Sequence, residues 1–166
     1  MEGKDREIIA RYGEDMLRFV SRTVRCREDA EEVVQDVFVR ALRSLSQYDE
    51  RRASMRTWLT CIAYNEVMRY HEQRKNEPTL VPLHELCDDT AETSDDDRRR
   101  DMLEWAIRRL SKDERLLLSM RYADGLSIRD MAFITGIKEQ NLPVRMQRIR
   151  ERLKIIIKEL GYERLH

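Results

Sequence analysis

An acidic stretch near the middle of the chain limits the folds open to this sequence. Residues 85–97 read ELCDDTAETSDDD, with seven acidic residues, no basic residue and almost nothing to bury. Pro78 and Pro82 precede this stretch. Such a segment cannot offset the entropy cost of folding by burying apolar surface, so it predicts a flexible acidic linker over residues 78–97. The chain then divides into a first module, residues 1–77, and a second, residues 98–166.

Composition favours an all-α fold for both modules. The 166 residues include only five Gly and three Pro, too few for a fold rich in tight turns. Charged residues make up 39% of the chain and hydrophobic residues 41%, a mixture typical of exposed amphipathic helices. We therefore expect two small helical domains, and the length excludes a large multidomain enzyme.

Charge is distributed unevenly, although the 32 basic and 32 acidic residues cancel. Residues 51–75 carry six basic and two acidic side chains, and residues 97–166 carry seventeen and eleven. Residues 76–96 between them carry seven acidic side chains and no basic one. Attraction to nucleic acid must therefore come from these two basic blocks, because the net charge of the whole chain provides none.

The sequence contains no recognisable catalytic or metal-binding pattern. The three cysteines lie 35 and 26 residues apart, which suits neither a metal-ligand pair nor a set of disulfides, and the three histidines are scattered. Neither a Gly-rich phosphate loop nor a run of about 18 apolar residues occurs. We therefore expect a non-enzymatic protein without metal or cofactor, cytoplasmic and without stable membrane insertion.

A helix is predicted over residues 29–46 in the first module. Apolar residues from Val33 to Leu45 recur every three to four positions and define its buried face. The opposite side is an acidic stripe that contains one apolar residue. Such a stripe is most often a solvated face, and the alternative is a docking surface for a basic partner. The stripe consists of Asp29, Glu32, Gln35, Asp36 and Val39.

A polar loop and a second helix follow, over residues 47–54 and 54–73. The helix buries Trp58 and Tyr70, whereas Tyr64 points elsewhere and Glu66 falls on the apolar face, which the periodicity does not explain. Aromatic side chains stack on unpaired bases and cations follow phosphates, so this region could hold single-stranded nucleic acid. The residues that could do so are Arg51, Arg52, Tyr64, Asn65, Arg74 and Lys75.

The second module has the spacing of a helix-turn-helix. Ser111 begins a capping box with Glu114, and Ser127 can cap the next helix. The small residue Ala132 suits the point where two helices cross, and Gly136 suits a turn that needs a positive φ. Leu142 is then the apolar anchor inside the second helix. The alternative is an ordinary helical hairpin with a basic solvated face.

The predicted recognition helix begins near Asn141, a good N-cap, which places Pro143 in the first turn. Residues 138–158 carry seven basic and two acidic side chains. Basic charge on the helix expected to enter the major groove favours DNA binding over the hairpin.

Three separated stretches resemble one protein family. DAEEVVQDVFVRAL at residues 29–42, TWLTCIAYNEVMRYHEQRK at 57–75 and LSIRDMAFITGI at 126–137 are similar to the small two-domain extracytoplasmic-function sigma factors of bacterial RNA polymerase. The resemblance implies a promoter-specificity subunit whose partners are core polymerase, promoter DNA and an anti-sigma factor. The stretches occur in the family's order, which a helix-turn-helix alone would not establish.

The resemblance also implies a role for each candidate surface. The acidic stripe of residues 29–39 becomes a contact with core polymerase. The loop and helix over residues 47–75, with the six residues named above, correspond to the part that melts the minus-ten element. The part that reads the minus-thirty-five element corresponds to Ser127, Lys138, Gln140, Asn141, Arg145, Arg148 and Arg150.

Two departures from the family and one rival function stay open at this point. His71, Glu72 and Gln73 separate Asn65 from the next basic pair, and Pro143 stands where relatives often have a cation. The rival is a conventional dimeric helix-turn-helix regulator, whose first module would dimerise or sense a ligand. Such a regulator would bind a palindrome unaided, whereas a sigma factor would accompany core polymerase as one copy.

Overall fold

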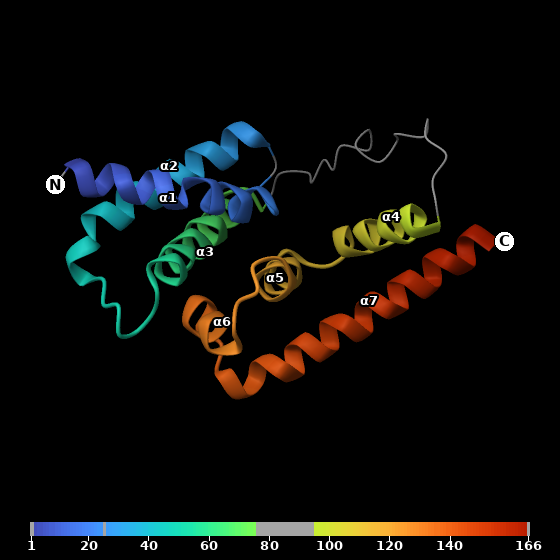
Figure 1. The fold of residues 1–166 in the computed structure, drawn as a ribbon. Coiled ribbons are helices and arrows are strands. Elements are labelled where there is room, and N and C mark those ends of the chain that lie inside the picture. The colour runs from blue at the N-terminus through green and yellow to red at the C-terminus, as the bar shows by residue number, and fades with distance from the viewer. Residues whose placement is uncertain (1, 25, 76–94, 166) are drawn as a thin grey trace.

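The first module consists of three helices. The computed structural model describes residues 2–24, 26–75 and 95–165 of the chain. α1 (Glu2–Ser21), α2 (Arg27–Arg43) and α3 (Met55–Gln73) pack against one another, and a 3-10 turn (Leu45–Gln47) follows α2. Figure 1 shows α3 beneath the α1–α2 pair. Their shared core includes Met16, Phe19, Val37, Leu59 and Val67, all at most 2% exposed.

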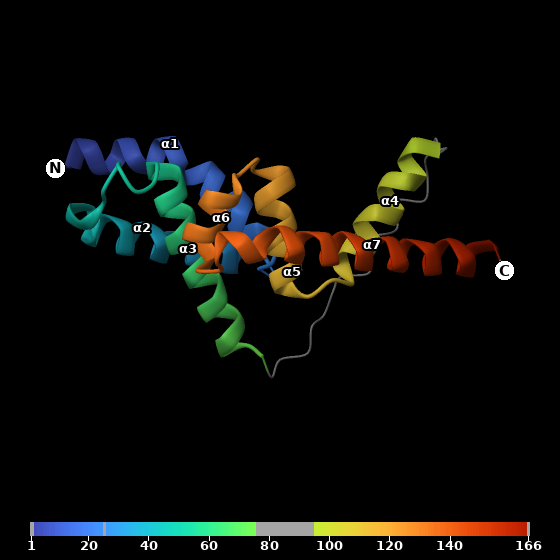
Figure 2. The same cartoon turned by 90° about the horizontal axis from the view of Figure 1, so that it is seen from below.

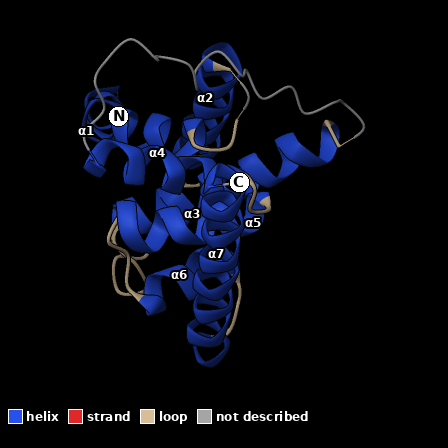
Figure 3. Cartoon of the chain, turned by 90° about the vertical axis from the view of Figure 1, so that its right-hand side faces the viewer, coloured by secondary structure: helices blue, strands red, loops and turns tan. Residues whose placement is uncertain are grey.

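The second module consists of four helices. These are α4 (Asp95–Arg108), α5 (Lys112–Leu118), α6 (Ile128–Thr135) and α7 (Leu142–Leu165). A π-helical turn (Ser119–Ala123) extends α5, and a 3-10 turn (Glu139–Asn141) precedes α7. α4, α5 and α6 all pack against α7, and α4 lies against its C-terminal half (Figures 1 and 2). The described part of the chain is helix and connecting loop without a strand, which confirms the all-α prediction (Figure 3).

The C-terminal end of the predicted linker is helical. Residues 78–94 of the predicted linker lie outside the described residues. Asp95, Asp96 and Asp97, however, form the first turn of α4. Acidic side chains are stabilised by the partial positive charge at a helix N-terminus, so three consecutive aspartates can begin a helix.

Local capping signals define three helix boundaries of the second module as the sequence predicted. The Ser111 hydroxyl accepts a hydrogen bond from the Glu114 N–H at 3.2 Å, and the Glu114 carboxylate accepts one from the Ser111 N–H at 3.1 Å. Ser127 Oγ accepts a hydrogen bond from the Asp130 N–H at 3.0 Å. Gly136 has φ +77°, a conformation that costs other residues energy, and it ends α6. The helix-turn-helix is thus fixed by its predicted residues.

α3 is packed on three sides, by α1, α2 and α6. It therefore has no single polar face, which is why its buried residues include Thr57, Thr60 and Glu66. The contact with α6 joins the two modules, and their buried side chains form one continuous core. None of the described helices contains a segment long and apolar enough to cross a bilayer.

Candidate protein and nucleic-acid interfaces

The polar stripe of α2 lies on the outer surface of the first module. Glu32, Gln35, Asp36 and Val39 are all exposed, Val39 to 46% of its surface. Residues three and four positions apart share one side of a helix, so these four form a continuous strip. A strip of negative charge with an exposed apolar side chain is suited to a basic protein surface that also offers an apolar contact.

Asp29, the fifth residue of the predicted stripe, is held by α3. The Tyr70 hydroxyl donates a hydrogen bond to Asp29 Oδ2 at 2.6 Å, and Arg74 Nε lies 4.0 Å from the same oxygen. The Asp29 side chain is only 28% exposed. The structure therefore places Asp29 at the edge of the strip, where it fastens α2 to α3.

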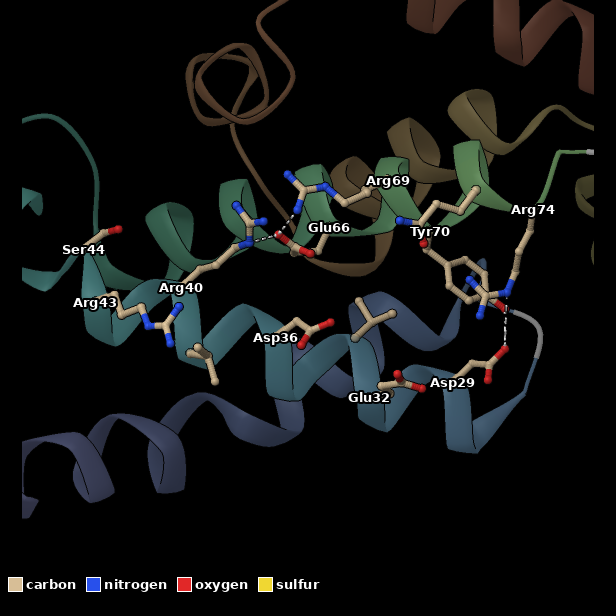
Figure 4. Close-up of a pocket in the computed structure, with 13 residues that line it drawn as sticks. Asp29, Glu32, Asp36, Arg40, Arg43, Ser44, Glu66, Arg69, Tyr70 and Arg74 are labelled. Atoms are coloured by element: carbon tan, nitrogen blue, oxygen red, sulfur yellow. Dashed lines mark hydrogen bonds and ion pairs between the residues drawn. The ribbon is translucent and has the colours of Figure 1, made fainter.

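Glu66 has a partner that the sequence pattern did not reveal. Its carboxylate is 7% exposed and forms an ion pair with Arg40 of α2, and Arg69 Nη1 lies 4.0 Å away. Figure 4 shows this cluster in a groove between α2 and α3, with Glu32 and Asp36 along the same groove. A buried carboxylate is costly unless it is paired, and Arg40 supplies the pairing from a different helix.

The loop before α3 is ordered by its own side chains. Asp49 Oδ1 accepts a hydrogen bond from the Arg51 N–H at 2.9 Å, and the Tyr48 hydroxyl donates to the Ala53 carbonyl at 3.1 Å. The Tyr48 and Trp58 rings pack with their centroids 5.2 Å apart. Trp58 thus supports the loop, which leaves Arg51 and Arg52 exposed.

Tyr64 and Asn65 occupy different surroundings in the middle of α3. Asn65 is exposed, but Tyr64 is half-buried on the side of α3 that faces the second module. Burial raises the pKa of the Tyr64 phenol, nearby Asp113 raises it further, and Arg145 opposes the change. Asp113 and Arg145 both belong to the second module, so the expected minus-ten residue Tyr64 lies beside the expected minus-thirty-five residue Arg145.

The C-terminal end of α3 carries the remaining basic candidates. The Arg74 guanidinium lies over the Tyr70 ring, 3.9 Å from its centroid, and Lys75 forms an ion pair with Glu72 at 3.0 Å. Burial lowers the pKa of His71 to about 4, and the charges of Lys112, Arg115 and Arg74 lower it as well. The six minus-ten candidates thus lie on α3 and just beyond its two ends. At 1.5 Å per residue, α3 is roughly 28 Å long.

The predicted recognition helix is α7, which begins directly after a 3-10 turn. The Asn141 N–H donates to the Lys138 carbonyl at 2.9 Å, and Leu142 is fully buried as the expected anchor. Met146 and Ile149 continue the buried side of α7. The polar candidates around this start are exposed, and they are Ser127, Lys138, Gln140, Asn141, Arg145 and Arg148.

Arg150 lies apart from the other two arginines of α7. Its Nη1 donates a hydrogen bond to the Tyr122 hydroxyl at 2.9 Å. Arg145 and Arg148 are three residues apart and share a side of the helix, whereas Arg150 is two residues beyond Arg148 and points to another side. The structure therefore brings Arg145 and Arg148 together and leaves Arg150 beside the π-helical turn.

The two modules are joined by a charged contact and a packed one. Arg22 donates two hydrogen bonds to the Asp124 carboxylate, at 2.7 and 3.0 Å, and the two side chains are 21% and 14% exposed. Cys61 Sγ of α3 lies 3.8 and 3.7 Å from the carbonyl oxygens of Phe133 and Ile134 in α6. Sequence reasoning missed these residues, because partners 72 to 102 positions apart leave no periodic signal.

Comparison with known families assigns both modules. Residues 8–77 match sigma-70 region 2, and residues 100–153 match sigma-70 region 4. Curated relatives include the extracytoplasmic-function (ECF) RNA polymerase sigma factor SigM of Bacillus subtilis, 25% identical over 90% of this chain and 93% of the relative. RNA polymerase sigma factor CarQ of Myxococcus xanthus is 27% identical over 95% of this chain and 91% of its own.

Solved structures share the fold. CnrH, determined in complex with the cytosolic domain of CnrY, has a TM-score of 0.69 at 19% identity and covers 96% of this chain and 90% of its own. The sigma factor RpoE of Bartonella quintana, in complex with the anti-sigma factor NepR, has a TM-score of 0.66 at 22% identity. That match covers 95% of this chain and 98% of RpoE.

Proposed function

Because the chain belongs to the ECF group of the sigma-70 family, and is thus a promoter-recognising subunit of RNA polymerase, we propose a division of labour between its two modules. Residues 1–77 bind core polymerase and hold the melted minus-ten element. Residues 98–166 bind the minus-thirty-five element as duplex. The chain contributes no catalytic group of its own. The observation that carries this proposal is the exposure of two separate polar surfaces, one on α2 and one on α7.

Core binding is assigned to the α2 strip, Glu32, Gln35, Asp36 and Val39. These side chains are exposed and lie on one side of a helix whose other side is buried in the module. Asp29 supports the strip from its edge through its hydrogen bond with Tyr70. A fixed row of acidic groups favours a basic partner and accelerates encounter through electrostatic attraction.

The minus-ten element is assigned to α3 and the loop before it. Arg51 and Arg52 lie at one end of the helix, Tyr64 and Asn65 in its middle, and Arg74 and Lys75 at its far end. A melted strand that follows the helix could contact cations at both ends and an aromatic ring at the centre. A base taken out of the stack exposes the face on which Tyr64 would pack.

The minus-thirty-five element is assigned to the start of α7. Arg145 and Arg148 are exposed within the first two turns, where a recognition helix reaches base edges or flanking phosphates. Ser127, Lys138, Gln140 and Asn141 lie at the start of α6 and in the turn before α7, which suits contacts with the sugar-phosphate backbone. Arg150 donates one N–H to Tyr122 and is exposed, so its remaining donors suit a contact with the sugar-phosphate backbone.

These assignments require the modules to separate on promoter DNA. Tyr64 and Arg145 lie close enough in this structure for their charges to interact. The two promoter elements, in contrast, are about 25 base pairs apart, which is about 85 Å of duplex at 3.4 Å per base pair. The packing of α3 against α6 is therefore a resting arrangement, and the DNA-bound chain adopts a more extended one.

An anti-sigma protein is the further partner that we propose, acting on a chain located in the cytoplasm. Two of the structures that share this fold were solved with a bound partner, and NepR is described as an anti-sigma factor. A protein that holds the modules together would keep Tyr64 covered and prevent promoter binding.

Run-off transcription tests the proposed function. Purified core polymerase is supplied with a library of promoter fragments, with and without this chain. We expect chain-dependent transcripts from a subset of fragments that share two sequence elements at one spacing. Transcripts independent of the chain on every fragment would contradict the proposal. A dimer that binds a palindrome without polymerase would instead support the rival regulator.

A further inference from the structure

The groove between α2 and α3 has two halves of opposite charge. The half of the groove beside the N-terminal part of α2 is lined by Glu32 and Asp36 of the proposed core-binding strip. The other half is lined by Arg40 and Arg43 from the end of α2 and Arg69 from α3. Figure 4 shows Arg40, Arg43 and Arg69 toward one end of the groove. Glu32 and Asp36 lie toward the other end, where Arg74 lies beside Asp29. Glu32 and Arg43 are eleven residues apart on α2, about 16 Å.

Glu66 organises the basic half. It is the buried carboxylate between two guanidinium groups, those of Arg40 and Arg69, whose side chains are 49% and 54% exposed. Each arginine is therefore held at the Glu66 end while part of its surface remains open to a partner. One carboxylate between two guanidiniums leaves excess positive charge, and exposed Arg43 adds to it.

We infer that Glu66 is a positioning residue that fixes Arg40 and Arg69 as the basic half of the core-polymerase docking site. The inference rests on the proposed function of the α2 strip. It adds the basic half of the groove to the surface that binds core polymerase. The partner is then an element of core polymerase that carries basic groups opposite Glu32 and Asp36 and acidic groups opposite the arginines. Two patches of opposite sign fix the direction in which that element lies, because the reversed orientation places like charges together.

A purely structural role is the alternative for Glu66. An acidic N-terminal half and a basic C-terminal half also suit the dipole of α2, and the Glu66–Arg40 pair joins two helices. The experiment must therefore distinguish two roles of the pair: holding α2 against α3, and offering the positive charge of Arg40 to a partner. Exchanging the two charges does so, because the pair survives while the exposed arginine is lost.

The test measures binding of the labelled full-length chain to purified core polymerase, together with its thermal unfolding. Glu66→Gln should weaken core binding about tenfold, the loss expected when a charge pair at an interface is disrupted. The exchange Arg40→Glu with Glu66→Arg keeps an ion pair between α2 and α3, although its new guanidinium lies near Arg69, and it should still bind core weakly. Recovery of wild-type affinity by the exchange would overturn the inference, because a structural pair would suffice.

Arg43→Glu keeps the test decisive if the exchanged pair fails to fold. Arg43 is exposed at the end of α2, so its reversal should weaken core binding about tenfold without changing the unfolding temperature. Arg6→Glu, an equally exposed reversal on α1 outside the groove, is the matched control and should bind normally. Wild-type core affinity of Arg43→Glu would overturn the inference.

Two further outcomes are distinguishable. If Glu32→Lys with Asp36→Lys abolishes core binding but the arginine variants bind normally, the basic half of the groove does not bind core polymerase. The inference is then overturned, and the proposed function of the α2 strip stands. If neither set affects core binding, the proposed function of the strip fails as well. If the arginine variants bind core normally and instead lower the salt dependence of promoter binding by the polymerase complex, the arginines contact DNA phosphates and the inference is overturned.

Discussion

The outer face of α2 and the inner face of α3 belong to the same small module but meet different surroundings. The α2 strip is exposed, and the Arg40–Glu66 ion pair lies at its C-terminal border. The α3 face, with Cys61 and Tyr64, is covered by α6 of the second module. This arrangement leaves the proposed core-binding surface available while one of the proposed DNA-binding surfaces is covered. Binding to core polymerase can therefore come first.

Opening of the covered face breaks the Arg22–Asp124 contact and the packing of α3 against α6, so it needs a partner that offsets this cost. The Arg22–Asp124 pair is mostly buried, and breaking such a pair leaves an uncompensated charge. A partner that binds the separated modules better than the packed ones shifts the population by its difference in affinity for the two states.

The largest expected effect concerns the exposed face. Glu32→Lys with Asp36→Lys should weaken core binding at least about hundredfold, because like charges placed together at an interface cost several kcal/mol. Helicity and thermal unfolding should change little, since exposed charges usually alter stability by less than about 0.5 kcal/mol. Co-elution with core polymerase measures the effect. Normal co-elution of this double variant would remove the α2 strip from the interface.

The next effect concerns the covered face. Asp124→Asn should expose Cys61 and speed its reaction with a thiol reagent at least about tenfold, because loss of one partner of a buried pair costs about 3 kcal/mol. Cys26 and Cys87 are first replaced by Ser so that Cys61 alone reports. The exchange Arg22→Asp with Asp124→Arg should restore slow labelling. Equal rates for Asp124→Asn and the parent chain would show that the pair does not hold the modules together.

A third effect separates two kinds of DNA contact on α7. Arg145→Ala in the polymerase complex should cost about 1 to 3 kcal/mol and relax preference at one upstream promoter position. Lys154→Ala lies over two turns later, so it should weaken all sequences alike and lower the salt slope by about one. Binding to a promoter library at several salt concentrations measures both. Unchanged preference and affinity for Arg145→Ala and for Arg148→Ala would reassign the helix.

The smallest expected effect is a pH dependence of the packed arrangement. His71 has a pKa of about 4 here, lowered by burial and by Lys112, Arg115 and Arg74, whereas a solvated imidazole titrates near about 6.5. The packed state therefore binds fewer protons between these values. Its stability is fully present above about pH 6.5 and falls as the pH drops toward 4.

Labelling of Cys61 compared between the parent chain and His71→Gln at each pH isolates this contribution. The ratio of the two rates cancels the pH dependence of the thiol itself. We expect the parent chain to open relative to the variant as the pH falls below 6.5. A ratio that stays constant from pH 7 to pH 5 would mean that His71 keeps the same pKa when the modules separate.

Local features of this fold were predictable, and contacts between distant segments were not. Helix boundaries are predictable from Ser111, Ser127 and Gly136, because capping hydrogen bonds and a positive φ involve only residues close in sequence. The strip on α2 follows from helical spacing alone. Asp29 was expected on that strip but is partly buried, because its partner Tyr70 comes from another helix. Glu66 was unexplained for the same reason, since Arg40 lies 26 positions away in α2.

The covered face was beyond prediction for a related reason. Tyr64 has the spacing of an outward residue of α3, and only the position of the second module determines whether it meets solvent or protein. A helix that is packed on three sides, such as α3, also has no clear alternation of apolar and polar residues, on which such predictions depend. Arg22 and Asp124 carry no pattern at all, as they meet only after two modules have folded and packed.

The separation of α3 from α6 on the promoter is the central claim, and energy transfer between one fluorophore on each helix tests it most directly. Cysteines at exposed Glu72 and Arg129 carry the labels, after Cys26 and Cys87 are replaced by Ser and Cys61 by Ala. We expect high transfer in the free chain and low transfer in the complex with core polymerase and promoter DNA. High transfer retained in a transcribing complex would contradict it, because packed modules could not reach two elements about 85 Å apart.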